Sequence, residues 1–123
     1  MIIDSDTDQL RKLSEGFSTD FKVLSCSRGS QALELFKLYQ PSALILDPAT
    51  YQLDGRHFIG QVRALSRRSP LPILALTRIA TIGQLEASFG WNVDALYSKP
   101  CDAERLKKKL NECLGRLKPL ALS

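Results

Sequence analysis

The chain has 123 residues, 44% of them hydrophobic and 24% charged, which predicts one globular domain and excludes a disordered, collagen-like or coiled-coil chain. The net charge of +4 is compatible with a nucleic-acid partner, but no apolar run approaches the roughly 18 residues of a membrane helix. We expect no signal peptide, and three widely spaced cysteines without a CxxC pattern favour free thiols in a reducing compartment.

Five short apolar runs along the chain predict β-strands. The run Ala43-Leu44-Ile45-Leu46 is apolar on both faces, which is typical of a buried strand in a parallel sheet. The predicted strands cover residues 1–3, 21–25, 43–47, 72–76 and 94–98.

Between and after these runs, apolar residues recur at helical spacing and predict five amphipathic helices. A capping box of Thr81 and Gln84 opens the fourth helix, and Asp102 and Glu104 suit the first turn of the fifth. The alternation predicts a doubly wound α/β domain with a parallel sheet. The apolar stripes contain Leu10, Leu13 and Phe17; Ala32, Leu35, Phe36 and Tyr39; Phe58, Val62 and Leu65; Ile82, Leu85 and Phe89; and Leu106, Leu110, Cys113, Leu114 and Leu117.

Polar residues follow four of the strands, at the sheet edge where such folds bind ligands. Asp4 and Asp6 follow the first strand, Asp47 ends the third, and Thr77 and Lys99 follow the fourth and fifth. An acidic cluster suits a hard cation such as Mg²⁺, and a hydroxyl with an ammonium group suits a phosphoryl group. A central carboxylate can act as the nucleophile that becomes an acyl phosphate.

Over nearly its whole length the chain resembles the receiver domain of two-component response regulators. The resemblance implies a flavodoxin-like (βα)5 fold with strand order 2-1-3-4-5. It rests on ordered motifs: Ile2-Ile3-Asp4-Ser5-Asp6, Leu44-Ile45-Leu46-Asp47-Pro48, Asp54-Gly55, Leu76-Thr77 thirty residues after Asp47, and Ser98-Lys99-Pro100 twenty-two residues after Thr77.

By position, the resemblance implies that Asp47 is the phosphoacceptor. Thr77 and Lys99 would contact phosphoryl oxygens. Mg²⁺ would lie in an acidic pocket formed by Asp4, Asp6, Asp47 and the backbone carbonyl of Ala49. The bond from Lys99 to Pro100 corresponds to a peptide that is often cis in the family.

Three residues of the pocket and the switch position depart from the family pattern. Ser5 stands where a second acid contacts the metal, so weaker Mg²⁺ binding is expected. Arg78 follows Thr77 where a small residue is usual, and it could clamp a phosphate or obstruct the pocket. Leu96 takes the place of the aromatic switch residue, and its neighbour Tyr97 should face the opposite side of the strand.

The resemblance implies a cytoplasmic signalling domain and not an enzyme, beyond catalysis of its own phosphoryl transfer and dephosphorylation. The implied phosphodonor is a histidine kinase or a phosphotransfer protein. A homodimer or an output domain would use the fourth and fifth helices, and no direct nucleic-acid or membrane contact is expected. Residues 1–118 would form the receiver domain, and 119–123 a C-terminal tail or the start of a linker.

Two alternatives remain open at this point. Ser5 and Leu96 suggest a degenerate pseudo-receiver, which would act as a phosphorylation-independent docking or dimerisation module. A flavodoxin-like domain for another ligand, nucleic acid included, is the second. Residues 102–118 hold six Lys and Arg against three Asp and Glu. We expect Arg105, Lys107, Lys108 and Lys109 to form a solvated face or the basic edge of a protein-interaction surface.

Overall fold

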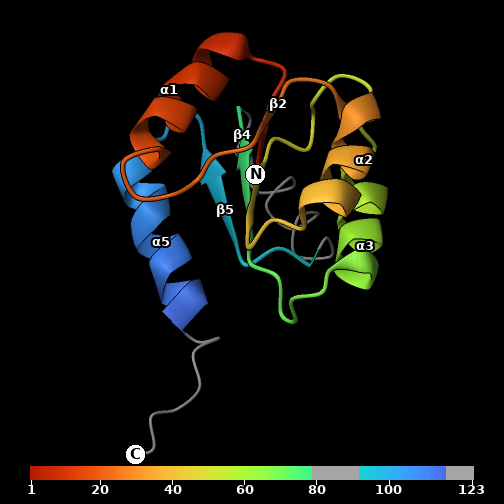
Figure 1. Cartoon of the computed structure of the whole chain (residues 1–123). Coiled ribbons are helices and arrows are strands. Elements are labelled where there is room, and N and C mark those ends of the chain that lie inside the picture. Colours follow the sequence, from red (N-terminus) through yellow and green to blue (C-terminus); the bar gives the residue numbers. More distant parts are fainter. Residues whose placement is uncertain (79–91, 116–123) are drawn as a thin grey trace, which may run out of the picture.

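The computed structural model describes residues 1–78 and 92–115, which form a sheet with helices on both of its faces (Figure 1). Strands and helices alternate through most of the described chain. The elements are β1 Ile2–Ile3, α1 Thr7–Phe17, β2 Ser25–Cys26, α2 Gly29–Tyr39, β3 Leu44–Leu46, α3 Gly55–Leu65, β4 Ile73–Thr77, β5 Ala95–Ser98 and α5 Ala103–Gly115.

The five strands form one sheet of order β2-β1-β3-β4-β5, and every neighbouring pair is parallel. This order confirms the one that the resemblance implied. The second strand differs from its prediction, since residues 21–25 were expected and Ser25–Cys26 are observed. Pairing begins only where the carbonyl of Leu24 accepts the amide of Ile2, and Phe21 and Val23 instead pack against the core as partly buried side chains.

Two apolar layers, one on each face of the sheet, hold the fold together. On one face Ile2, Ile45 and Leu74 pack with the buried stripes of α1 and α5. On the other, Ile3 and Leu44 pack with residues of α2 and α3. Removal of this apolar surface from water is the main force that fixes the helices on the sheet. Successive strand residues therefore serve opposite layers, and the strand ends point their polar residues to one edge.

Side-chain caps fix where several helices begin. The Asp6 carboxylate accepts the amide of Gln9 at the start of α1, and Asp102 accepts the amide of Arg105 in the same way. Asn92 has a φ of 62°, a left-handed geometry that asparagine tolerates. The predicted fourth helix, with its capping box at Thr81 and Gln84, lies outside the described residues.

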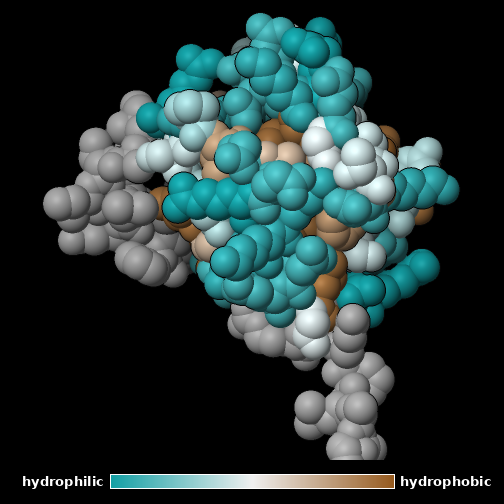
Figure 2. All heavy atoms as spheres, turned by 90° about the vertical axis from the view of Figure 1, so that its left-hand side faces the viewer, coloured by the Kyte–Doolittle hydropathy of each residue, from teal (hydrophilic) through white to brown (hydrophobic). Residues whose placement is uncertain are grey.

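The outer side formed by α1 and α5 is mainly hydrophilic, with small apolar areas between the polar side chains (Figure 2). Arg105 and Lys108 are exposed there, as expected. Lys107 contradicts the expectation of a solvated position, because it is only 6% exposed. Its ammonium lies 2.8 Å from the carboxylate of Asp20, in the loop after α1, and 3.1 Å from that of Glu104. The loop thus supplies partners that helical periodicity cannot reveal.

All three cysteines are buried and form no disulfide, in agreement with the sequence. Among the described helices, none has the length and apolar character needed to cross a membrane.

Candidate functional site

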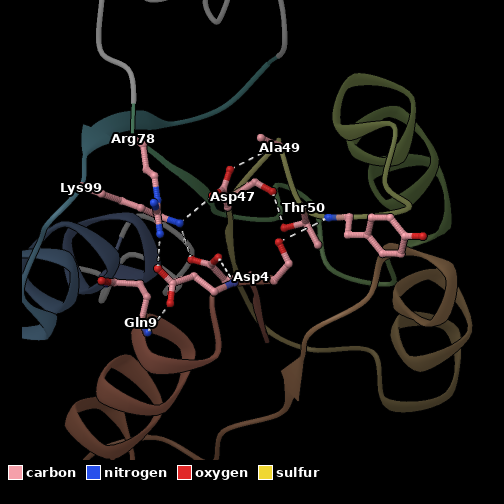
Figure 3. Close-up of polar contacts among 10 residues, drawn as sticks. Asp4, Gln9, Asp47, Ala49, Thr50, Arg78 and Lys99 are labelled. Atoms are coloured by element: carbon pink, nitrogen blue, oxygen red, sulfur yellow. Dashed lines mark hydrogen bonds and ion pairs between the residues drawn. The ribbon is translucent and has the colours of Figure 1, made fainter.

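A pocket of about 600 Å³ opens at the carboxyl ends of the strands. Figure 3 shows its polar side chains converging from β3, β4, β5 and the segment after β1. The structure therefore brings together every residue that the sequence placed in the acidic and phosphoryl-contacting groups. The lining residues are Asp4, Ser5, Asp6, Thr7, Asp47, Ala49, Thr77, Arg78 and Lys99.

Asp47 lies at the end of β3 and is buried, with an exposed fraction of 8%. One of its carboxylate oxygens accepts the amide N–H of Ala49 at 2.8 Å, and the other lies 2.6 Å from the ammonium of Lys99. Its backbone carbonyl accepts the hydroxyl of Thr50 at 2.7 Å, which holds the loop after β3 in place. The carboxylate is thus oriented from two sides without being enclosed.

Lys99 bridges two buried carboxylates. Its Nζ lies 2.7 Å from Asp4 and 2.6 Å from Asp47, and all three side chains are at most 10% exposed. Burial acts to lower the pKa of Lys99, but hydrogen bonds and charge from both carboxylates outweigh it, so the pKa is raised above its ordinary value. The side chain is therefore a fixed cation beside Asp47. The bond from Lys99 to Pro100 is cis, as the resemblance suggested.

Asp6 and Arg78 form an ion pair at the mouth of the pocket. The Arg78 guanidinium lies 2.5 Å from the Asp6 carboxylate, and Figure 3 shows its side chain reaching from the end of β4 across the pocket. The pKa of Asp6 is lowered first by the hydrogen bond from the Gln9 amide and then by the one from Arg78. The negative charge of Asp6 is therefore matched at the pocket entrance.

Ser5 is exposed at the edge of the same pocket, and its hydroxyl oxygen accepts the amide of Tyr51 at 3.4 Å. This long bond connects the segment after β1 to the loop after β3. A hydroxyl at this position adds no negative charge to the pocket, in contrast with the carboxylates of Asp4 and Asp47.

Leu96 and Tyr97 do not line the pocket. The Tyr97 ring packs against the core layer that α1 and α5 cover, and the Arg105 guanidinium of α5 lies 5.0 Å from its centre. Burial raises the pKa of the Tyr97 hydroxyl. Leu96 is partly buried on β5. Because neighbouring strand residues point to opposite faces, Tyr97 does not occupy the place of the missing aromatic residue.

The donor set of the pocket fits a magnesium ion that is completed by phosphate and water. Within residues 1–78 and 92–115, no group of three His, Cys, Asp or Glu side chains is placed to hold a metal ion. Mg²⁺, however, is commonly bound through one or two carboxylates together with substrate phosphates. Asp4 and Asp47 would supply the two carboxylates, and the Ala49 carbonyl and the Ser5 hydroxyl would supply neutral oxygens from the same lining.

Two contributors to the site were missed from the sequence. Thr7 lines the pocket from the first turn of α1, and Thr50 holds the backbone of Asp47. A threonine three residues after Asp47 is a pattern for a local hydroxyl-to-backbone bond, so Thr50 could have been found. No sequence pattern indicates the role of Thr7, since its place in the pocket depends on where the first turn of α1 lies relative to the carboxyl edge of the sheet.

The fold and the pocket together define a doubly wound α/β domain with paired buried carboxylates at its ligand-binding edge. A family model described as the response regulator receiver domain matches residues 1–111. The chain belongs to this family of signalling domains.

Individual relatives agree with the family. The response regulator Rre1 of Synechocystis sp. is 27% identical over 119 residues, which cover 94% of this chain and 52% of that protein. This chain spans about half the length of the curated relatives it matches.

Solved structures agree on the fold. A CheY-like response regulator receiver domain protein from Methanospirillum hungatei JF-1 has a TM-score of 0.82 at 19% identity, covering 94% of this chain and 92% of that one. A response regulator protein from Burkholderia pseudomallei has a TM-score of 0.78 at 20% identity, covering 94% and 69%. Its structure contains a phosphorylated aspartic acid, a calcium ion and citrate.

Proposed function

We propose that this receiver domain accepts a phosphoryl group on Asp47 from a histidine kinase or a phosphotransfer protein. The observation that carries the proposal is the setting of the Asp47 carboxylate. It is held between the Ala49 amide and the Lys99 ammonium at the base of an open pocket. The family, and the phosphorylated aspartic acid of the Burkholderia pseudomallei neighbour, support phosphorylation of an aspartic acid in this domain.

In the transfer step, a carboxylate oxygen of Asp47 attacks the phosphorus atom and forms a P–O bond. The bond between phosphorus and the donor atom breaks, and its electron pair stays with the donor. Lys99 is positioned to neutralise the charge on the phosphoryl oxygens, and the Thr77 hydroxyl can donate a hydrogen bond to one of them. Neither residue has to enter the pocket, because both already line it.

Asp4, Asp47 and the Ala49 carbonyl would hold Mg²⁺ in this pocket, with Asp6 and the Ser5 hydroxyl at its edge. When bound, the ion would offset negative charge as the phosphoryl group approaches the carboxylate. Ser5 makes the site less acidic than the family pattern, so we infer that the ion is held more weakly than where a second acid is present.

The phosphorylated domain would act through a partner or an output domain. The curated relatives are about twice as long as this chain, which supports a role for residues 1–118 as one module and 119–123 as a tail or linker. We propose that the contact uses the surface of α5 together with the predicted fourth helix, which lies outside the described residues. The exposed basic residues Arg105 and Lys108 of α5 would lie at its edge.

Incubation with acetyl phosphate and Mg²⁺, followed by intact-mass measurement, tests the proposal. The parent chain should gain the mass of one phosphoryl group, and Asp47→Asn should gain none. Omission of Mg²⁺ should reduce the gain in the parent. Equal labelling of parent and Asp47→Asn would reject Asp47 as the acceptor. No labelling, together with partner binding that survives Asp47→Asn, would favour a phosphorylation-independent docking module.

A further inference from the structure

Arg78 is a cation at the mouth of the pocket whose only described ion pair is with a single carboxylate. It follows Thr77 directly at the end of β4 and lines the same pocket as Asp47 and Lys99. Its guanidinium bonds to Asp6, and its side chain is 70% exposed. Figure 3 shows its side chain extending from the end of β4 toward the acidic residues of the pocket.

Breaking the ion pair between Arg78 and Asp6 should cost the fold little stability. Exposed ion pairs stabilise a fold weakly because water and salt screen them. The other carboxylate oxygen of Asp6 accepts the Gln9 amide, so the first turn of α1 keeps its cap when Arg78 leaves. Arg78 can therefore leave Asp6 and bind a more highly charged anion while the first turn of α1 stays capped.

The charge of the pocket favours such an exchange once Asp47 is phosphorylated. Of the two cationic side chains in the described lining, Lys99 is already buried between Asp4 and Asp47. A phosphoryl group on Asp47 brings additional negative charge. Because Ser5 replaces the second acid of the family pattern, the pocket also has one carboxylate fewer than that pattern to retain a metal cation. Arg78 is the cation still able to move, and a guanidinium can bind two phosphate oxygens at once.

We propose that Arg78 exchanges Asp6 for the phosphoryl group on Asp47 and binds its oxygens alongside Lys99. The inference rests on the proposed function, since it requires an anion at Asp47. Arg78 is then a phosphate-binding residue specific to this chain's pocket. An exposed arginine that merely covers the pocket would instead hinder the anion.

Isothermal titration with beryllofluoride at saturating Mg²⁺ measures the role of Arg78, because this anion mimics a phosphoryl group on a carboxylate. Arg78→Ala should weaken binding by about tenfold, the scale of one charged hydrogen bond, and Arg78→Lys should recover part of the loss. Arg67→Ala removes an exposed arginine between α3 and β4, on the opposite edge of the sheet, and should leave the affinity unchanged.

A double-mutant cycle with Asp6→Asn separates exchange from a general charge effect. Asparagine keeps a capping oxygen for α1 but no longer competes for Arg78 with a full charge. Asp6→Asn should therefore bind beryllofluoride several-fold more tightly. Most of that gain should disappear in Asp6→Asn/Arg78→Ala, and a gain of equal size in both backgrounds would refute the exchange.

The outcomes also separate this inference from the function beneath it. If the parent binds beryllofluoride and Arg78→Ala binds it equally well or better, Arg78 only covers the pocket and the inference is wrong, while the phosphoacceptor role stands. If the parent does not bind the anion at all, both proposals fall.

Discussion

Ser5 and Asp4 are adjacent in sequence but occupy different environments in the pocket. Asp4 is buried, and one of its carboxylate oxygens is paired with Lys99 while the other accepts the Asp6 amide. Ser5 is exposed and contacts only the loop after β3 among its described hydrogen bonds. A substitution that changes the charge at position 5 should therefore leave the buried ion pairs in place.

Ser5→Asp should tighten Mg²⁺ binding by roughly tenfold, the scale of a change in the shell around a metal site. The physical reason is that a carboxylate replaces a neutral hydroxyl at the edge of the proposed donor set. Calorimetric titration with Mg²⁺ provides the measurement. Ser42→Asp, an exposed position on the opposite edge of the sheet, adds the same charge and should have little effect. Equal affinity in Ser5→Asp and the parent would show that position 5 lies outside the metal site.

At this scale, the sequence predicts some residues and cannot predict others. Asp47, Thr77 and Lys99 could be grouped because each ends or follows a parallel strand. The pairing of Arg78 with Asp6 could not, since the two are 72 positions apart and the contact depends on side-chain direction. Lys107 was misplaced for a similar reason, because its partner Asp20 lies in a loop.

The helices α1 and α5 approach each other closely at Gly16 and Ala103. A Cβ atom built on Gly16 of α1 would lie 2.5 Å from the Cβ of Ala103, at the start of α5. Non-bonded Cβ atoms essentially never approach so closely, so the helices need glycine there to reach their observed separation. In α3, a Cβ on Gly60 would meet nothing within 4 Å.

Gly16→Ala should therefore destabilise the domain by about 1–3 kcal/mol, the usual cost of overpacking. Gly60→Ala should instead stabilise it by about 0.5–1 kcal/mol, because alanine is the better helix former and no neighbour is displaced. Urea unfolding of the two variants measures both free energies. Stabilisation by both substitutions would mean that α1 and α5 can separate freely.

Lys107 connects α5 to the loop after α1 through Asp20 and Thr19. Its hydrogen bond and charge lower the pKa of Asp20, so this contribution to stability is present above the ordinary value of 3.8. It is lost as the pH falls through the lower pKa of the folded state. Asp20 and Glu104 in turn raise the pKa of Lys107, so the pair is intact at neutral pH.

Lys107→Met should lower the unfolding midpoint near neutral pH, since it removes the ion pair while largely keeping the buried volume. The difference from the parent should narrow as the pH falls below 3.8. Thermal unfolding across this range checks the trend, and Lys108→Met tests the exposed neighbour. A difference that is independent of pH, or an equal effect of Lys108→Met, would argue against an electrostatic role for Lys107.

Among the elements, periodicity located the described helices well and the strands less well. β3 and β4 lie within or next to their predicted runs because they are buried on both faces. β2 is shorter and later than expected, since Phe21 and Val23 contribute apolar contacts to the core without entering the ladder. Hydrophobicity alone cannot distinguish these two uses of an apolar residue.

At the scale of the whole molecule, the faces of the sheet stabilise the fold and its carboxyl edge holds the candidate site. Its two faces carry the apolar layers, and its carboxyl edge carries the pocket. Strand order could be expected only from the family resemblance, since periodicity does not specify which strands are neighbours. Of the cations behind the net charge of +4, Lys99 and Lys107 are engaged in ion pairs with carboxylates.

The central claim is that Asp47 is the residue that receives the phosphoryl group. Borohydride reduces an aspartyl phosphate to homoserine, so treatment of the acetyl-phosphate-labelled chain followed by peptide sequencing identifies the acceptor directly. We predict homoserine at position 47 alone. Homoserine at position 4 or 6, or at no acidic position of a chain that has gained phosphoryl mass, would contradict the assignment.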